Sequence, residues 1–112
     1  MASGDIITNR KYFRHIRLLD ALGATDNGVW IDCLSFTSIS IEVSGITTAT
    51  VLINTSNAAT KPANTAHGQL RATFTADGEY TSNNLPRWLK ARISPWTSGT
   101  ISAIATLRGV RG

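Results

Sequence analysis

The sequence predicts an all-β protein, a single antiparallel β-sandwich of about eight short strands with an extended N-terminal arm. Three observations lead to this prediction. Apolar and polar side chains alternate along several short runs, clusters of Gly, Asp, Asn and Pro separate these runs, and no helical periodicity interrupts them. Alternation with a period of two is typical of a strand with one buried and one exposed face. The pattern fits either a jelly-roll or an immunoglobulin-like topology.

The composition supports the same fold class. A chain of 112 residues is long enough for one domain with one modest core. Charged residues make up only 16% of the chain, against about 25% in an average soluble domain. Ser and Thr together contribute 25 residues. A surface rich in hydroxyls suits β-structure, because Thr favours strands and Ser favours turns. It also suits a protein that packs against copies of a neighbour.

The clearest strand signal runs from Phe36 to Asn54. Apolar side chains alternate with polar ones on both sides of a break at Ser44-Gly45, which we interpret as the turn of a hairpin. A hairpin cannot bury its apolar face alone, so the rest of the chain must supply the other half of the core. The residues expected to face this core are Ile39, Ile41, Val43, Ala49, Val51 and Ile53.

The segment before this run divides into an N-terminal arm, residues 1–14, and the start of the sandwich domain, residues 15–112. Residues 15–22 are expected to form a strand, because the turn-forming sequence GATDNG follows directly. Residues 29–34 are expected to form another. The apolar positions change parity near Leu34, which predicts a kink where the chain passes from one sheet to the other.

The segment after this run starts with a polar loop, residues 55–68, that has no periodic apolar signal. Long loops on small β-domains often make contacts, and its central part, Ala58 to Ala66, is the candidate contact if the N-terminal arm is not. The Asp77-Gly78 dipeptide and the stretch from Pro95 to Gly99 are expected to be turns. The remaining strands are expected over residues 69–75, 79–81, 87–94 and 100–107.

The chain has a net charge of +4, and four of its eleven basic residues lie close together near the N-terminus. No broad basic stripe with interleaved aromatic residues is present, so we do not expect nucleic acid as a partner. Ordering the arm costs roughly 1–2 kcal/mol per residue, which burial of its aromatic rings against a partner would offset. The alternative is an edge strand folded onto its own domain. The residues expected to contact a neighbouring subunit are Arg10, Lys11, Tyr12, Phe13, Arg14 and Arg17.

No residue pattern predicts catalysis, a cofactor or a metal site. Cys33 is the single cysteine, and its strand-like surroundings favour a small buried side chain over a catalytic thiol. A paired-carboxylate hydrolase needs two carboxylates in one cleft, whereas Asp32 and Glu42 lie on expected strands among Ser and Thr. The glycines are spread through turns and form no phosphate-binding loop. We therefore expect a non-enzymatic protein without a cofactor.

Three tryptophans, Trp30, Trp88 and Trp96, are candidate interface aromatics. Exposed tryptophan rings could stack on sugars, as they do in carbohydrate-binding sandwiches. The more economical interpretation is that they cover the rim of the sandwich or pack at a subunit interface, where Trp is enriched.

The opening residues, MASGDIITNRKYF, lack the apolar segment of a signal peptide. No apolar run has the length needed to cross a bilayer. We expect synthesis in a cytoplasm, without secretion by the usual route and without a membrane partner.

Two runs of the chain resemble small β-sandwich virion proteins of tailed bacteriophages. They are ATDNGVWIDCLSFTSISIEVSGITTATVLINTSN and TADGEYTSNNLPRWLKARISPWTSGTISAIATLRG, and the similarity covers roughly residues 23–108. The shared motifs are structural, with a strand ending in VSG near the start and a TSGTISA stretch near the close. Such proteins serve as capsid decoration (cement) proteins, as tail or baseplate adornments, or as fibre-like attachments.

The resemblance implies a capsid decoration protein on the exterior of a virion, made in the host cytoplasm. Its partners would be the major capsid protein and other copies of itself, and a homotrimer is the oligomer that such proteins suggest. The alternative is a tail or fibre module that recognises a host-surface glycan through Trp88 or Trp96. Cement proteins are present in hundreds of copies per particle and tail components in a few, so copy number separates the two.

Overall fold

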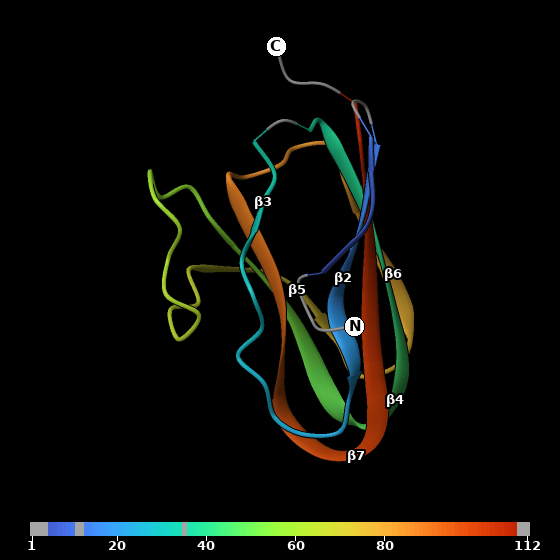
Figure 1. Ribbon diagram of the computed structural model, residues 1–112. Coiled ribbons are helices and arrows are strands. Elements are labelled where there is room, and N and C mark those ends of the chain that lie inside the picture. The colour runs from blue at the N-terminus through green and yellow to red at the C-terminus, as the bar shows by residue number, and fades with distance from the viewer. Residues whose placement is uncertain (1–4, 11–12, 35, 110–112) are drawn as a thin grey trace.

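The computed structural model describes residues 5–10, 13–34 and 36–109. All regular structure in these residues is antiparallel β-strand (Figure 1). The strands are β1 (Asp5–Arg10), β2 (Phe13–Leu22), β3 (Ile31–Asp32), β4 (Ser38–Ser56), β5 (Gln69–Phe74), β6 (Gly78–Ser82) and β7 (Trp88–Arg108). The expected all-β sandwich is confirmed. The strands differ from the expected set because two pairs of short strands are continuous and because β1 is added.

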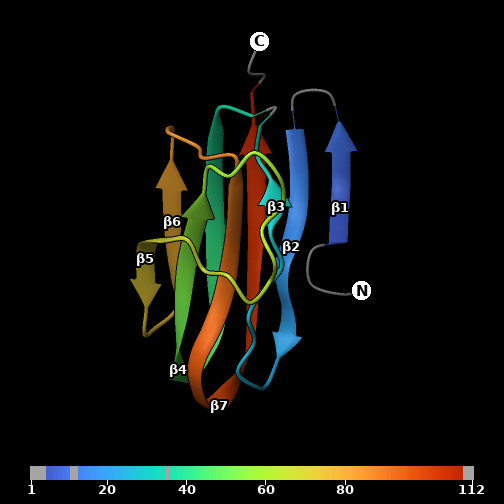
Figure 2. The ribbon, with the colours of Figure 1, turned by 90° about the vertical axis from the view of Figure 1, so that its left-hand side faces the viewer.

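The long strands β4 and β7 form the spine of the fold. They pair along their whole length as a two-stranded ribbon, from Ser38 opposite Arg108 to Ser56 opposite Trp88. The register shifts repeatedly where this ribbon bends back on itself. One half of the ribbon builds a first layer in the order β6-β4-β7-β2-β1. The other half builds a second layer in the order β5-β4-β7-β3. Figures 1 and 2 show the two halves of the bent ribbon facing each other.

The hairpin expected at Ser44-Gly45 is wrong, because β4 continues through this position. Gly45 has a φ of 83°, and a Cβ there would collide with the backbone carbonyl of Thr100 in β7. The turn expected from Pro95 to Gly99 is likewise part of β7. Glycine is needed at position 45 because two strands approach closely at the bend, not because the chain reverses there.

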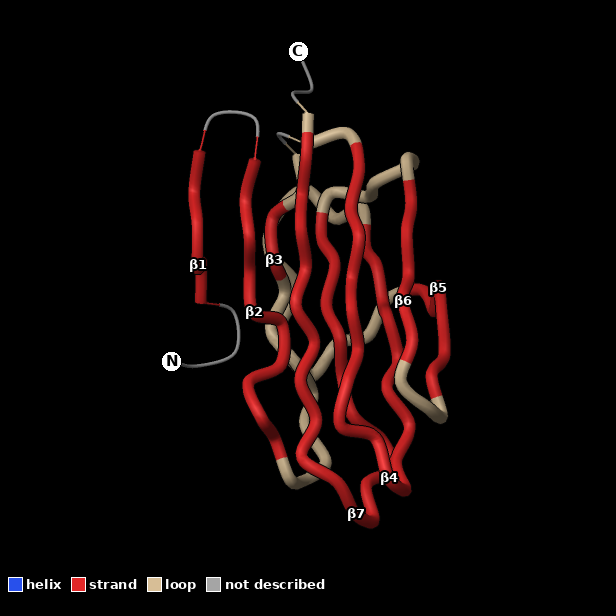
Figure 3. The backbone as a smooth tube through the Cα atoms, turned by 90° about the vertical axis from the view of Figure 1, so that its right-hand side faces the viewer, coloured by secondary structure: helices blue, strands red, loops and turns tan. Residues whose placement is uncertain are grey.

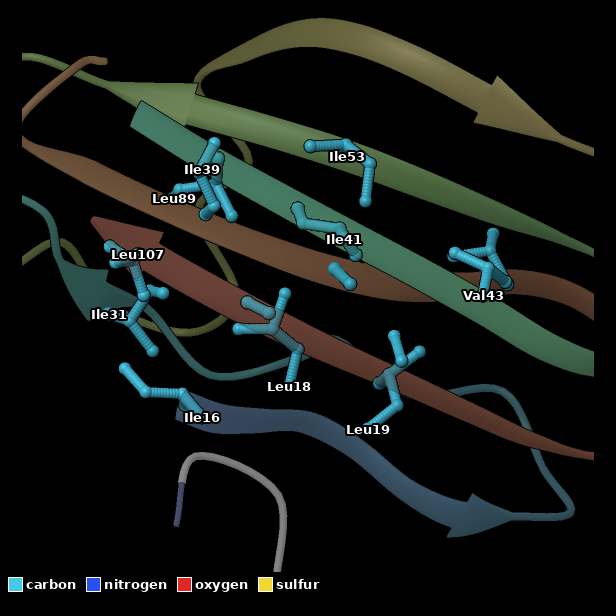
Figure 4. Close-up of a cluster of buried hydrophobic side chains, with 14 of the residues drawn as sticks. Ile16, Leu18, Leu19, Ile31, Ile39, Ile41, Val43, Ile53, Leu89 and Leu107 are labelled. Atoms are coloured by element: carbon cyan, nitrogen blue, oxygen red, sulfur yellow. The ribbon is translucent and has the colours of Figure 1, made fainter. Parts of the chain in front are cut away.

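The core lies between the two layers, and the odd-numbered positions of β4 point into it as predicted. Ile39, Ile41, Val43, Val51 and Ile53 are buried, while Ala49 is half-buried and packs against the same cluster. Strand β7 contributes alternate residues from both of its halves, and Cys33 is fully buried, as its sequence surroundings predicted. Figure 4 shows buried aliphatic side chains from β2, β3, β4 and β7 converging in this core.

The change of sheet expected near Leu34 is confirmed. The short strand β3 pairs with β7 in the second layer, whereas β4 begins in the first layer. Between the two, the amide of Phe36 donates to the carbonyl of Cys33 over 3.1 Å, which marks a turn. Most of the segment expected to be a strand over residues 29–34 is irregular, and only Ile31 and Asp32 pair.

The N-terminal segment pairs with the edge of the sandwich. Strand β1 pairs antiparallel with β2, from Asp5 opposite Arg17 to Arg10 opposite Phe13. This is the edge-strand alternative that the sequence left open. The expected boundary after residue 14 falls inside β2, because β2 begins at Phe13.

Candidate interaction surfaces

Four of the six residues expected to contact a neighbour lie at one edge of the first layer, in the paired strands β1 and β2. Arg10 ends β1, and Lys11 and Tyr12 lie outside the described residues. The Phe13 ring is partly buried and meets the His15 ring edge-on, with 6.3 Å between the centroids. The structure therefore places Arg10, Arg14 and Arg17 in two paired strands at one edge of the first layer.

The two other basic residues of this set contact their own domain. The guanidinium of Arg14 lies 5.0 Å from the centroid of the Phe36 ring. Arg17 Nη1 donates to Asp20 Oδ1 over 2.9 Å, and both side chains are partly exposed. Such an exposed pair is worth little stability, about 0–1 kcal/mol. These contacts orient the two arginines against their own domain.

The opposite edge of the first layer is β6, and its charge is negative. Glu79 of β6 stands directly opposite Glu42 of β4. Both side chains are exposed, and neither makes an ion pair with a described residue. Asp77, in the turn before β6, accepts a hydrogen bond from the Ile46 amide over 2.9 Å. Like charges directly opposite each other in a sheet are destabilising, and this pair is left uncompensated within the described residues.

The two tryptophans Trp30 and Trp88 anchor the long polar loop to the second layer. The Trp30 Nε1 donates to the carbonyl of Ala63 over 2.9 Å, and the Trp88 Nε1 donates to the carbonyl of Ala58 over 3.1 Å. Both rings are buried, at 2% and 8% exposure. Figure 2 shows the loop crossing the face of β7 and β3.

The third tryptophan, Trp96, is half-buried and packs against the core, and its Nε1 donates to the carbonyl of Gly99 over 3.0 Å. None of the three rings is an exposed platform on which a sugar could stack. The rings of Trp30 and Trp88 are covered by this chain's own loop. They therefore lie at the rim of the sandwich, one of the two positions expected from the sequence.

Lys90 is a buried charged residue that the sequence did not reveal. It lies in β7 with a fully buried side chain, and its Nζ donates to the carbonyls of Asn64 and Ala66, over 2.7 and 2.8 Å. It also lies 2.8 Å from His67 Nδ1 and 4.9 Å from the Trp30 ring centroid. An ammonium group has three N–H donors, so this site satisfies all of them and adds a cation–π contact.

Burial lowers the pKa of both ionisable groups in this contact, Lys90 and His67. Desolvation, together with the positive charge of Arg92, lowers the pKa of Lys90 to about 8, although Asp26 opposes the shift. Desolvation and the charges of Lys90 and Arg92 lower the pKa of His67 below 6.5. A neutral His67 can accept a hydrogen bond at Nδ1, whereas a protonated ring cannot.

The outer face of the first layer carries a shallow open depression of about 320 Å³. It is lined by His15, Ser40, Glu42, Glu79, Ile104 and Thr106. Another open depression, of about 290 Å³, lies at the bend of the ribbon and is lined mainly by threonines. Both are open to solvent and resemble contact surfaces more than sites that enclose a small molecule.

Within the described residues, no group of three or more His, Cys, Asp or Glu side chains is arranged to hold a metal ion. The same part of the chain contains no helix with the length and apolar character needed to span a membrane. Comparison with protein-family models, with curated proteins and with solved structures found no match for this chain.

Proposed function

We propose that this chain is a non-enzymatic structural protein of a bacteriophage virion, a capsid decoration protein that binds the capsid exterior as a homo-oligomer. The resemblance over roughly residues 23–108 supports the class of protein. The sandwich fold supports it too, because a rigid β-domain with a hydroxyl-rich surface can pack against a shell without a catalytic site. The partners in this proposal are the major capsid protein and further copies of the same chain.

The observation that carries the proposal is the position of the basic hairpin. Strand β1 pairs only with β2 among the described strands, so its other side presents backbone N–H and C=O groups that a neighbour can bond. Addition of a strand to an exposed sheet edge is a common mode of recognition between proteins. The basic residues on the same edge supply charge-assisted hydrogen bonds to an acidic neighbour.

Deletion of residues 2–14 tests this role. The truncated protein retains β3 to β7 and most of β2, so we expect a folded domain that no longer occupies particles. The measurement is the number of copies per particle, by quantitative gel of purified virions or of empty shells incubated with the protein. A Lys61→Ser variant, altered in the exposed loop, is the matched control and should bind like the parent.

Parental copy number after the deletion would show that the hairpin is not the anchor. In that case the loop from Ala58 to Ala66 becomes the better contact, because it is largely exposed and held in place by buried side chains.

A further inference from the structure

Two strand edges lie open on the side of the sandwich away from β1. Strand β5 ends the second layer and β6 ends the first, and each pairs only with β4 among the described strands. Figures 2 and 3 show the two strands next to each other, on the opposite side of the molecule from β1. A Cβ at Gly78 of β6 would lie 3.0 Å from the Phe74 ring of β5, so the two strands meet at these residues. Unprotected edges are the sites at which sheets of separate chains join.

The two edges carry opposite charge. Arg71 is the single charged residue of β5, Glu79 is the single charged residue of β6, and both are exposed. The Nη2 of Arg71 donates to the carbonyl of Asn84 over 3.4 Å, which is long for a hydrogen bond. A carboxylate is a stronger acceptor for this guanidinium. Glu79 stands opposite Glu42 and makes no ion pair with a described residue.

The β5 edge also exposes apolar area. Leu70 is 57% exposed, against 46% for Leu34, the other large apolar residue that the described part of the chain exposes. It precedes Arg71 in β5. A neighbour on this edge would remove the Leu70 side chain from water, which is favourable.

We propose that a second copy of this chain docks on this side about a two-fold axis parallel to the strands, so that β5 of each copy pairs with β6 of the other. The strands match in length, with six residues in β5 and five in β6. Figure 2 shows them running in opposite directions. Rotation about an axis parallel to the strands keeps these directions, so the two strands pair antiparallel. Each layer of one copy then continues into the other layer of the second copy.

The positions of the charges along the strands fit this arrangement. Phe74 and Gly78 lie at one level within a copy, and the axis preserves levels, so Phe74 of one copy comes opposite Gly78 of the other. Counting along the antiparallel strands from there places Arg71 diagonally across from Glu79 of the second copy. Long side chains interact over such a diagonal. Arg71 thereby compensates the pair of Glu42 and Glu79, whose repulsion the monomer retains.

Charge also selects this axis over another two-fold axis. An axis perpendicular to the layers would pair β5 with β5 and β6 with β6. It would set Arg71 against Arg71 and Glu79 against Glu79, which like-charge repulsion disfavours. The proposed contact uses the same surface of both copies and closes as a dimer.

The inference rests on the homo-oligomer part of the proposed function and names the surface that makes it. It gives a dimer in place of the homotrimer that the resemblance implies. The β1 edge takes no part in the contact and stays free to bind the shell.

Charge reversal tests the contact. Arg71→Glu alone and Glu79→Arg alone each place like charges across the interface. A variant with both reversals restores opposite charges, because position 71 of one copy meets position 79 of the other. Both positions are exposed, and Glu79→Arg exchanges the repulsion from Glu42 for an attraction, so we expect all three variants to fold. Circular dichroism and thermal melting check this.

Analytical ultracentrifugation over a wide range of protein concentration gives the oligomeric state. We expect the parent to dimerise and the dissociation constant to rise by about 10-fold or more in each single variant. Parental association should return in the double variant and in an equimolar mixture of the two single variants. A Lys61→Glu variant, altered in the exposed loop, is the control and should associate like the parent.

Three results would each overturn the inference: a monomeric parent, single variants that associate like the parent, or a folded double variant that stays monomeric. A monomeric parent that still decorates particles would leave the proposed function standing. A dimer that depends on positions 71 and 79 but binds no particle would support the inference and contradict the proposed function.

Discussion

Lys90 shows how a single side chain holds the loop over the second layer. Its charge is buried, yet each of its donors has an acceptor, and all three acceptors come from residues 64–67. The sequence places Trp88, Lys90 and Arg92 on the face of β7 opposite to Leu89 and Ala91, and the structure agrees. Periodicity could not reveal that a polar loop covers this face, because the loop has no apolar pattern of its own.

We expect Lys90→Met to release this loop while the sandwich stays folded. Methionine keeps most of the length of the side chain but leaves the carbonyls of Asn64 and Ala66 without a donor. Hydrogen bonds to a charged group contribute about 1.5–3 kcal/mol each, so the docked loop should lose roughly 2 kcal/mol against opening. Hydrogen exchange of residues 57–68 measures this directly. Lys61→Met is the control, and unchanged protection in Lys90→Met would refute the assigned role.

Acid should weaken the same contact through His67. Its pKa is lower in the docked loop than the 6.5 of a free histidine. The undocked loop therefore takes up the proton first as the pH falls below about 6.5. The free energy of loop docking should therefore become less favourable as the pH falls through that window. It should stop changing once the pH is below the pKa of His67 in the docked loop. The groups that face His67 are Lys90 and Arg92, and Lys90 also responds to Asp26.

Titration of Lys90 affects loop docking only in the alkaline range. Its pKa of about 8 in the docked state lies below its ordinary 10.5, so docking strengthens as the pH rises between these values.

Hydrogen exchange of the loop at pH 7 and pH 5, corrected for intrinsic exchange rates, tests the predicted effect of His67. His67→Gln should flatten the response and His15→Gln should not. A loop whose corrected protection is equal at both pH values would contradict the assignment.

At the scale of elements, the alternation of side chains predicted which residues of β4 and β7 face the core, but not that each strand is continuous. A Ser-Gly break is compatible with a turn and with a bend. The choice between them depends on Thr100, which approaches Gly45 from a strand more than 50 positions away in the chain. Local sequence carries no information about that contact.

Gly45→Ala tests the bend. Alanine is strained at a φ of 83°, and its Cβ would collide with the Thr100 carbonyl, so the strands must separate. We expect a loss of about 2–4 kcal/mol in the free energy of unfolding, measured by urea denaturation. Gly23→Ala is the matched control, because its Cβ would lie 3.7 Å from the Gly99 carbonyl, an ordinary contact. Equal midpoints for parent and Gly45→Ala would show that the bend tolerates a side chain.

At the scale of the whole molecule, the sequence predicted the sandwich and its single core, because both follow from local alternation and length. It identified the basic segment near the N-terminus but left open whether that segment folds onto its own domain. The pairing of β1 with β2 answers this for residues 5–10. The acidic edge could not be foreseen, because Glu42 and Glu79 become neighbours only when β6 pairs with β4.

The central claim is that this chain decorates a capsid, and the number of copies per particle tests it most directly. Quantitative gel analysis of purified virions, calibrated against the major capsid protein, gives that number. The account predicts copies in proportion to the capsid subunits, lost from particles when residues 2–14 are deleted. A few copies per particle would place the chain in a tail or fibre instead, and its absence from particles would contradict a structural role in the virion.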